Sequence, residues 1–301
     1  MSVSAKISNI ARGSLHDGPG VRTVIYFKGC GLRCRWCHNP ETFSKKREIL
    51  FTPSKCISCG ACSAVCPEHH TAGENGVTFL RDGCTACGRC ADVCPTLALS
   101  LCGEDMDTDT VFTAVEKDLT YYTASHGGVT FSGGECLLQP EAVAALARRA
   151  QELGLSTAVE TALFVPWENV RQVLPYISLF YADLKLADAE KHRHYTGQDN
   201  GLILENLQKL SIEHSNITVR IPVIPGVNDT AEDLDGFARI LRGLGPGVKQ
   251  VELLKYNILG ASKYDAIGRA WMRFADTPQS DEEMKRLCTA LEQQCKLPCT
   301  F

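Results

Sequence analysis

The sequence of 301 residues lacks several features that would indicate a membrane protein or a nucleic-acid-binding protein. No apolar run approaches the length of about 20 residues that a membrane-spanning helix needs, and residues 1–13 lack the apolar core of a signal peptide. The chain also has no basic block, and its formal net charge is −4, which argues against nucleic acid as a partner. We therefore expect a cytoplasmic protein whose partners are neither membranes nor nucleic acids.

Cysteine, by contrast, is abundant, with 16 residues in the chain. In a reducing compartment, closely spaced cysteines indicate metal binding rather than disulfide bonds. Eleven cysteines fall into three runs, which are Cys30, Cys34 and Cys37, then Cys56, Cys59, Cys62 and Cys66, then Cys84, Cys87, Cys90 and Cys94. The remaining five fit no ligand pattern, and we expect them to be small buried hydrophobic residues: Cys102, Cys136, Cys288, Cys295 and Cys299.

The first run has the pattern C-x3-C-x2-C, one cysteine fewer than a four-iron cluster can bind. Three thiolates leave one iron without a protein ligand, and that iron is open to a small molecule. A zinc site that adds His38 is the alternative, but zinc sites usually combine two ligand pairs separated by a longer loop. A disulfide does not suit the odd number of cysteines. The run therefore predicts an open 4Fe–4S cluster.

The second and third runs share the pattern C-x2-C-x2-C-x3-C followed by proline, which is typical of bacterial ferredoxins. In that pattern the last cysteine of each run binds the cluster of the other run. The segments CISCGACSAVCP and CTACGRCADVCP match at seven of twelve positions and start 28 residues apart, which indicates an internal duplication. We expect bound clusters to hold this insert together. One cluster would use Cys56, Cys59, Cys62 and Cys94, and the other Cys84, Cys87, Cys90 and Cys66.

Outside the insert, short apolar strands alternate with helical segments. Six βα units predict a parallel sheet and are too few for a closed eight-stranded barrel. The expected fold is α/β, a partial (β/α)6 barrel with an inserted ferredoxin-like domain that binds two 4Fe–4S clusters. The barrel would take residues 1–50 and 103–301, and the insert residues 51–102. We predict strands over 21–28, 129–132, 155–160, 178–184, 217–223 and 248–254, and helices over 108–125, 139–153, 166–174, 202–214, 230–244 and 281–294.

Unusual residues recur at the carboxyl ends of these strands, where α/β barrels assemble their active sites. The first cysteine run follows the first strand, and a Gly-Gly-Glu turn follows the second. Glycine lets backbone approach a ligand closely, and the glutamate could accept a hydrogen bond from an amine. We expect one site formed by the first cysteine run with Gly133, Gly134, Glu135, Thr161, Asp183, Lys185, Arg220 and Asn257.

With these motifs in order, the chain resembles the glycyl-radical-enzyme activating enzymes, a pyruvate formate-lyase activase-like group of the radical S-adenosylmethionine superfamily. The similar segments are HDGPGVR (16–22), CRWCHNP (34–40), TFSGGE (130–135), ADLK (182–185) and RIPVIPGVND (220–229). The insert resembles that of the subgroup serving dehydratases, decarboxylases and carbon–nitrogen or carbon–sulfur lyases. The resemblance extends from about residue 8 to the end of the chain.

The resemblance implies three 4Fe–4S clusters, one open and two auxiliary, with S-adenosylmethionine bound at the open iron. Reductive cleavage would give methionine and a 5′-deoxyadenosyl radical, which takes an α-hydrogen from one glycine of a partner glycyl radical enzyme. Ferredoxin or flavodoxin would supply the electron through the auxiliary clusters. A monovalent cation near Glu160 and Asp183 is a further implied cofactor, although Glu160 stands where an aspartate is common.

The resemblance also implies residue roles. Cys30, Cys34 and Cys37 would hold the reactive cluster, and Gly133, Gly134 and Glu135 the amino group of the cofactor. Trp36 and His38 would line its adenosine side. Asp17 would lie near the glycine loop of the partner. Thr161, Asp183, Lys185, Arg220 and Asn257 match positions around the cofactor or the cation. Asn257 replaces a frequent histidine, and Cys136 a usual proline or alanine.

Three other functions remain open at this point. An electron carrier would explain the insert but leave the first cysteine run unused, and a radical enzyme could act directly on a small molecule. A structural zinc protein is the third. The charged candidates could also be ordinary strand-end residues or ion-pair partners. We expect five histidines to face solvent: His69, His70, His192, His194 and His214.

Overall fold

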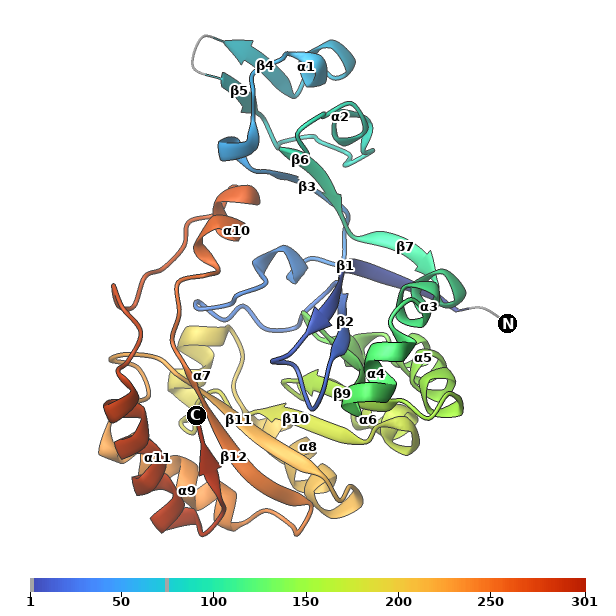
Figure 1. The fold of residues 1–301 in the computed structure, drawn as a ribbon. Helices are drawn as coiled ribbons and strands as arrows, with labels where there is room; N and C mark the ends of the chain where they lie inside the picture. Colours follow the sequence, from blue (N-terminus) through green and yellow to red (C-terminus); the bar gives the residue numbers. More distant parts are fainter. Residues whose placement is uncertain (1–2, 74–75) are drawn as a thin grey trace.

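The computed structural model describes residues 3–73 and 76–301 and has a mixed α/β fold around one large sheet (Figure 1). Within the described residues, this sheet has nine strands in the order β13-β12-β11-β10-β9-β8-β2-β1-β7. Their bounds are β1 (Ser4–Ser14), β2 (Arg22–Phe27), β7 (Glu104–Asp107), β8 (Gly128–Gly133), β9 (Ser156–Thr161), β10 (Leu179–Asp183), β11 (Ile217–Val223), β12 (Val248–Lys255) and β13 (Cys299–Thr300).

The six predicted strands are confirmed as β2, β8, β9, β10, β11 and β12, which pair in parallel with their neighbours. Three strands of this sheet were not predicted. β1 and β7 extend the sheet in antiparallel orientation beyond β2, and β13 pairs in parallel with β12. β7 and β13 end the strand order, so the sheet formed by the described residues is open rather than closed into a barrel.

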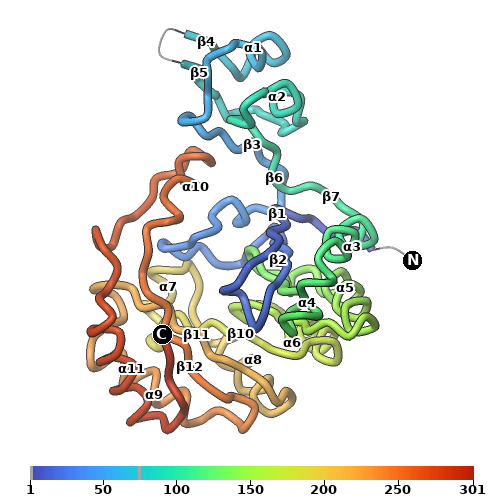
Figure 2. Tube along the Cα trace, viewed as in Figure 1, coloured from blue at the N-terminus to red at the C-terminus, as the bar shows by residue number. Residues whose placement is uncertain are grey.

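Most helices pack on the outer face of the sheet (Figures 1 and 2). The predicted helix over 108–125 is two helices, which meet where Asp118 binds Arg12 of β1 through two hydrogen bonds of 2.7 and 2.5 Å. In the described part of the chain, no helix combines the length and apolar character needed to cross a bilayer. The helices are α3 (Thr108–Glu116), α4 (Leu119–Ser125), α5 (Pro140–Glu152), α6 (Trp167–Val173), α7 (Ala189–Thr196), α8 (Gly201–Glu213), α9 (Ala231–Arg242), α10 (Ala261–Ala266) and α11 (Asp281–Cys295), with single turns η1 (Pro40–Thr42), η3 (Cys136–Leu138) and η4 (Leu174–Tyr176).

Alternation along the strands separates an apolar face from a polar one. Residues such as Ile25, Phe131 and Val219 are fully buried in the core between sheet and helices. Because successive side chains point to opposite faces, the residues between them line the inner face of the sheet. That face carries polar groups, among them Glu160 and Arg220, which form an ion pair. The sheet thus presents a polar inner face beside the carboxyl ends of its strands.

The cysteine-rich insert projects from the sheet on a two-stranded stem (Figure 1). The stem consists of β3 (Glu48–Phe51) and β6 (Leu99–Cys102), which pair antiparallel. Beyond it lie η2 (Pro53–Lys55), α1 (Ala61–Val65), the hairpin of β4 (His70–Gly73) and β5 (Gly76–Phe79), and α2 (Arg89–Asp92). Its buried apolar cluster consists of Ile49, Cys62, Ala86, Cys90 and Leu99, so two of its five members are cysteines.

The buried residue Arg22 anchors the loop between β1 and β2. Its guanidinium donates hydrogen bonds to Thr130 Oγ1 (2.6 Å), to the carbonyl of Val129 (2.7 Å) and to that of Pro19 (3.0 Å). Burial lowers the pKa of Arg22 to about 10. Gly18, with φ +132°, leaves room for this side chain, because a Cβ there would lie 2.8 Å from Arg22 Cδ. The Arg22 guanidinium therefore fixes the loop that contains Asp17.

We predict that Arg22→Met destabilises the protein by about 3 kcal/mol, because it leaves several buried carbonyls without a donor. Thermal or urea unfolding of the cluster-free chain measures the effect. Arg171→Met is the matched control, because Arg171 is 60% exposed in its ion pair with Glu168 and should change stability by less than about 0.5 kcal/mol. Equal effects of the two substitutions would show that Arg22 is not an anchor.

Candidate functional site

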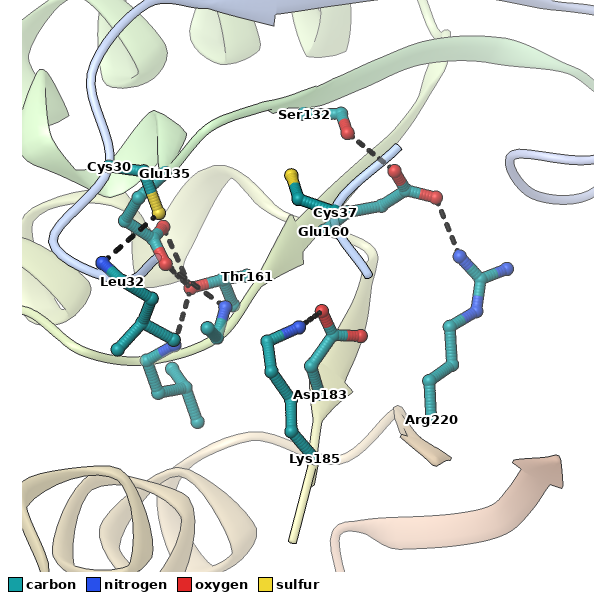
Figure 3. Close-up of polar contacts among 12 residues, drawn as sticks. Cys30, Leu32, Cys37, Ser132, Glu135, Glu160, Thr161, Asp183, Lys185 and Arg220 are labelled. Carbon is teal, nitrogen blue, oxygen red and sulfur yellow. Dashed lines mark hydrogen bonds and ion pairs between the residues drawn. The ribbon is translucent and has the colours of Figure 1, made fainter. Parts of the chain in front are cut away.

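A cavity of about 430 Å³ opens at the carboxyl ends of the parallel strands. The predicted convergence of residues at this edge is therefore observed, and Figure 3 shows part of the group. Glu135 and Asp17 are the predicted site residues that do not line the cavity. The lining contains Cys30, Cys34, Trp36, Cys37, His38, Gly133, Gly134, Thr161, Asp183, Lys185, Arg220 and Asn257.

The first cysteine run lies in a loop that follows β2 and is tied to its surroundings by backbone hydrogen bonds. The amide of Gly29 donates to the carbonyl of Thr42 (2.7 Å), and that of Arg33 to the carbonyl of Thr196 (2.7 Å). Within the loop, the amides of Leu32 and Asn39 donate to the sulfurs of Cys30 and Cys37, each at 3.4 Å. Backbone donors thus already point at two of the three sulfurs.

Burial leaves these three thiols in an environment that resists their ionisation. It raises the pKa of Cys30 to about 12 and also raises the pKa of Cys34 and Cys37. A thiolate is the form that binds metal, so a nearby positive charge must offset the desolvation. Three such thiols, two of them with amide donors, fit an iron–sulfur cluster, whose iron would supply that charge.

A single-ion site is a poorer fit to the same residues. Among the residues that the structure describes, no group of three or more His, Cys, Asp or Glu side chains could hold one metal ion. In a four-iron cluster each thiolate binds a different iron, so the sulfurs need not meet at one point. The geometry therefore favours a cluster over the zinc alternative.

An aromatic group forms one wall of the cavity. Trp36 is buried and lies 6.0 Å from the ring centroids of both Tyr195 and Phe274, and Tyr256 packs against Phe274 at 6.1 Å. His38 is exposed at the opening and Asn257 also lines it. Trp36 and Tyr256 line the cavity itself, and Tyr195 and Phe274 pack behind them. Aromatic side chains beside a polar rim are suited to a purine ring, because they can stack on such rings.

The Gly-Gly-Glu turn that follows β8 packs closely against the cysteine loop. A Cβ on Gly133 would lie 2.3 Å from the carbonyl oxygen of Phe27, and one on Gly134 would lie 2.4 Å from that of Gly29. The amide of Glu135 donates to the same Gly29 carbonyl at 2.8 Å. The glycines are therefore required for contact between the turn and the loop, in addition to any approach of a ligand.

The carboxylate of Glu135 lies below the cavity, with 1% of the residue exposed. It accepts hydrogen bonds from Thr161 Oγ1 (2.8 and 2.9 Å), from the amide of Ala162 (3.0 Å) and from that of Leu137 (3.2 Å). Burial nevertheless raises its pKa to about 7. The arrangement makes Glu135 a support for Thr161 and for the end of β9, rather than a group that faces the cavity.

Two ion pairs line the cavity (Figure 3). Lys185 Nζ lies 2.7 Å from Asp183 Oδ2. Burial lowers the pKa of Lys185, but the charges of Asp183 and Cys34 outweigh burial and the net pKa is raised. Lys185 is therefore a cation held beside the cysteine loop, and it can offset part of the negative charge of a bound cluster.

Arg220 lies between two carboxylates. Its Nη1 is 2.6 Å from Glu160 Oε1, its Nε is 2.6 Å from Glu252 Oε2, and its guanidinium lies 3.5 Å from the centre of the Tyr181 ring. The other oxygen of Glu160 accepts from Ser132 Oγ at 2.5 Å. Burial raises the pKa of Glu160, and the charge of Arg220 opposes that rise. Arg220 is thus an ion-pair partner in this structure.

Asp17 lies apart from the cavity, in the loop anchored by Arg22. Its carboxylate accepts a hydrogen bond from Ser14 Oγ, and its carbonyl accepts one from Thr130 Oγ1 at 2.7 Å. Thr130 projects from the inner face of β8, so the loop reaches the polar face of the sheet from the opposite end. The structure therefore separates Asp17 from the ligands of the predicted cluster.

A second group of cysteines lies together in the insert. Cys56, Cys59, Cys62 and Cys94 line one small hollow, the set predicted for the first closed cluster. The two halves of the insert also repeat their backbone: Ser58 and Ala86 have φ of 57° and 52°, and Gly60 and Gly88 have φ of 75° and 93°. In both halves the amide at the first of these positions donates to the preceding cysteine sulfur at 3.4 Å, from Ser58 to Cys56 and from Ala86 to Cys84.

Glu252 was not predicted as a site residue. It alternates with apolar residues along β12, and this pattern could have placed it on the inner face with Arg220.

The prediction that the histidines face solvent is wrong for His70 and His192, which are 2% and 1% exposed. The prediction that the other cysteines are buried is confirmed for Cys102, Cys136, Cys288 and Cys295, whereas Cys299 is half-buried.

Comparisons with known proteins agree with this geometry. Residues 16–172 match the family described as a 4Fe–4S single cluster domain. The (2S)-3-sulfopropanediol dehydratase activating enzyme of Klebsiella oxytoca is 43% identical over 270 residues, which cover 87% of this chain and 85% of that protein. The choline trimethylamine-lyase activating enzyme of Oleidesulfovibrio alaskensis is 38% identical over 292 residues, 94% of this chain and 93% of that protein.

A solved structure shares the fold. It is a radical SAM methyltransferase from Sphaerobacter thermophilus, with a TM-score of 0.54 and 16% identity. The match covers 100% of this chain and 76% of that one. At this identity the likeness concerns the fold alone.

The buried carboxyl group of Glu135 predicts a pH dependence of stability in the cluster-free chain. Its pKa is about 7 in the folded state against an ordinary value of 4.5, so between these pH values the folded chain holds a proton that the unfolded chain releases. Stability therefore falls as pH rises from about 4.5 to 7, by roughly 3 kcal/mol at most.

Urea unfolding from pH 5 to 8 measures this loss, and Glu135→Gln should remove it. Glu141→Gln, a change at an exposed residue of α5, is the control and should keep the wild-type slope. An identical slope in Glu135→Gln would assign the pH dependence to another group.

Proposed function

This chain belongs to the glycyl-radical-enzyme activating enzymes of the radical S-adenosylmethionine superfamily, and we propose that its cavity holds the reactive 4Fe–4S cluster together with the cofactor. It is an enzyme that binds iron–sulfur clusters and S-adenosylmethionine and activates a partner glycyl radical enzyme. Family membership decides against the electron carrier, the zinc protein and the radical enzyme for small molecules.

The observation that carries the proposal is the set of three cysteines, one buried and two half-buried, that line a cavity together with most of the other predicted site residues. Cys30, Cys34 and Cys37 would hold three irons and leave the fourth open toward the cavity. When bound, the cluster and S-adenosylmethionine supply one-electron cleavage of the sulfonium bond and hence the removal of a hydrogen atom from the partner's glycine.

The residues around the cavity would orient the cofactor. The backbone of Gly133 and Gly134 would accept hydrogen bonds from the methionine amino group. Trp36 and His38 would line the adenosine side. Thr161, whose hydroxyl is fixed by Glu135, and the pair of Lys185 with Asp183 would complete the polar wall with Asn257. In this assignment Glu135 is a positioning residue, because all its hydrogen bonds go to the chain itself.

The inner face of the sheet would receive the glycine loop of the partner. The sheet of the described residues is open, and its inner face is polar, with Ser132, Glu160 and Arg220 beside the cavity. An extended peptide has a backbone that needs hydrogen-bond partners, so a polar open groove suits it better than a closed pocket. Asp17, at the far end of this face, would contact the same loop.

The wider architecture would be a partial (β/α)6 barrel, residues 1–50 and 103–301, that carries a ferredoxin-like insert, residues 51–102. The insert would bind two auxiliary clusters, which makes three 4Fe–4S clusters in all. The hollow shared by Cys56, Cys59, Cys62 and Cys94 and the repeated backbone of the two halves support this assignment. The auxiliary clusters would relay an electron from ferredoxin or flavodoxin to the reactive cluster.

A monovalent cation, by contrast, finds no fitting site in this arrangement. Both oxygens of Glu160 are engaged, by Arg220 and Ser132, and Asp183 is paired with Lys185. A cation there would compete with two fixed positive charges, since like charges repel at these short distances. We therefore propose that the Arg220 guanidinium supplies the positive charge at this place.

Activation of a partner tests the proposed function directly. The reduced protein, S-adenosylmethionine and the glycyl radical enzyme encoded nearest its gene should give a glycine-centred radical by electron paramagnetic resonance, with about twelve iron atoms per chain. Substituting Cys30, Cys34 and Cys37 together by Ala should leave about eight iron atoms and no radical. A radical formed by this variant would refute the assigned reactive cluster.

A separate variant in the same experiment tests whether the auxiliary clusters relay the electron. Cys59→Ala with Cys87→Ala should abolish activation by reduced flavodoxin, because both auxiliary clusters lose a ligand. The same variant should keep activity with a strong artificial reductant that reaches the reactive cluster directly. Full activity with flavodoxin would refute the relay, whereas the assignment of the reactive site would stand.

The cation proposal predicts that activation proceeds at the same rate in potassium, sodium and tetramethylammonium buffers. Glu160→Asp should acquire a dependence on potassium, because the shorter carboxylate no longer reaches Arg220. Initial rates of glycyl radical formation at constant ionic strength measure both cases. A several-fold fall of the wild-type rate in tetramethylammonium would contradict the proposal.

A further inference from the structure

The two cysteine runs of the insert are repeats 28 residues apart, and this offset pairs His70 with Ala98. The backbone keeps one hydrogen bond of the repeat just before these positions, although Leu97 has φ of 54° and its counterpart His69 has no positive φ. The amide three residues after the fourth cysteine donates to the carbonyl of that cysteine in both halves, from His69 to Cys66 at 3.3 Å and from Leu97 to Cys94 at 3.2 Å. His70 and Ala98 are the next residues in each half.

Ala98 shows what this position faces. It lines the hollow formed by Cys56, Cys59, Cys62 and Cys94. By the internal repeat, His70 belongs to the wall of the other centre, whose proposed ligands are Cys84, Cys87, Cys90 and Cys66. Of these ligands, Cys66 contacts His70 directly, because the carbonyl of Cys66 accepts a hydrogen bond from the amide of His70 at 3.1 Å.

The imidazole of His70 has no protein partner that explains its burial. The residue is 2% exposed, its ring stacks on Phe79 with centroids 4.7 Å apart, and neither ring nitrogen has a hydrogen-bond partner among the described residues. His192, also buried, differs because its Nδ1 contacts the carbonyl of Gln198 at 2.6 Å. A neutral imidazole carries one N–H, and a buried N–H without an acceptor requires an explanation.

We propose that the N–H of His70 donates a hydrogen bond to a sulfur of the second auxiliary cluster, and that this bond raises the reduction potential of that cluster. The inference rests on the proposed function, because it requires the two auxiliary clusters. Reduction adds negative charge to a cluster, and a hydrogen bond to its sulfur stabilises the reduced form. The methyl side chain of Ala98 offers no such donor to the first cluster, whose Cys94 sulfur accepts from the amide of Leu99 at 3.4 Å instead.

The consequence is an influence on one of the two clusters that the sequence repeat does not provide for the other. The bond from His70 would favour reduction of the cluster beside it. His70 is a positioning and tuning residue here, because it acts on the cluster and not on the substrate.

The test uses the full chain, reconstituted anaerobically, with Cys30, Cys34 and Cys37 substituted by Ala so that only the auxiliary clusters give signals. His70→Ala copies the other half of the insert. We expect it to keep about eight iron atoms and to lower one of the two potentials, by about tenfold in the reduced-to-oxidised ratio, which corresponds to about 59 mV. Redox titration followed by electron paramagnetic resonance measures both potentials.

Four further variants separate the hydrogen bond from packing. His70→Gln or His70→Asn restores an N–H, and one of them should recover the wild-type potential. Ala98→His should raise the potential of the first cluster. His69→Ala is the matched control, because its ring already contacts the carbonyl of Leu80 at 3.0 Å, and both potentials should stay unchanged.

The outcomes are distinguishable. Full iron content with unchanged potentials in His70→Ala overturns the inference alone, whereas missing auxiliary clusters in the unsubstituted chain overturn the proposed clusters as well. If His70→Ala fails to load iron, pulsed electron–nuclear double resonance on the reduced unsubstituted chain with 15N-labelled histidine decides. A nitrogen-15 coupling to one auxiliary cluster supports the inference, and its absence overturns it.

Discussion

Buried sulfur without a compensating charge is the constraint on which the rest of this structure depends. The thiols of the first cysteine run are buried at the edge of the main cavity, and burial raises the pKa of each of them. Iron is what turns such thiols into thiolates at neutral pH, so the loop is complete only with its cluster. The insert follows the same rule, because cysteines occupy part of its small buried core.

The same demand for charge balance explains the inner face of the sheet. Asp183 and Lys185 pair beside the cysteine loop, and Glu160 and Glu252 pair with Arg220 across the ring of Tyr181. These buried charges are paired with opposite charges, because an isolated charge would cost far more than its pairing returns. The result is a polar but electrically balanced inner face beside the cavity proposed for the cluster.

Much of this could be predicted from sequence, and the reasons for the misses are physical. The six parallel strands can be recognised in the sequence as short apolar runs. The cysteine runs can be recognised as well, because the spacing of cluster ligands depends only on local geometry. The pairing of Arg220 with Glu160 could not be predicted, because it spans β10 and depends on the register of three strands. β1 was missed because it mixes polar and apolar residues along a half-exposed strand. The helix over 108–125 breaks where Asp118 turns toward Arg12, a contact with a distant segment.

The stem of the insert has an evolutionary consequence. β3 and β6 run antiparallel with Glu48 opposite Cys102, so the chain leaves the sheet and returns to it at neighbouring points. A short turn could join these two ends without disturbing the order of the large sheet. With the function proposed for the insert, electron supply and radical chemistry would be separable modules, and a lineage could gain, lose or exchange the insert while the sheet and its cavity keep their shape.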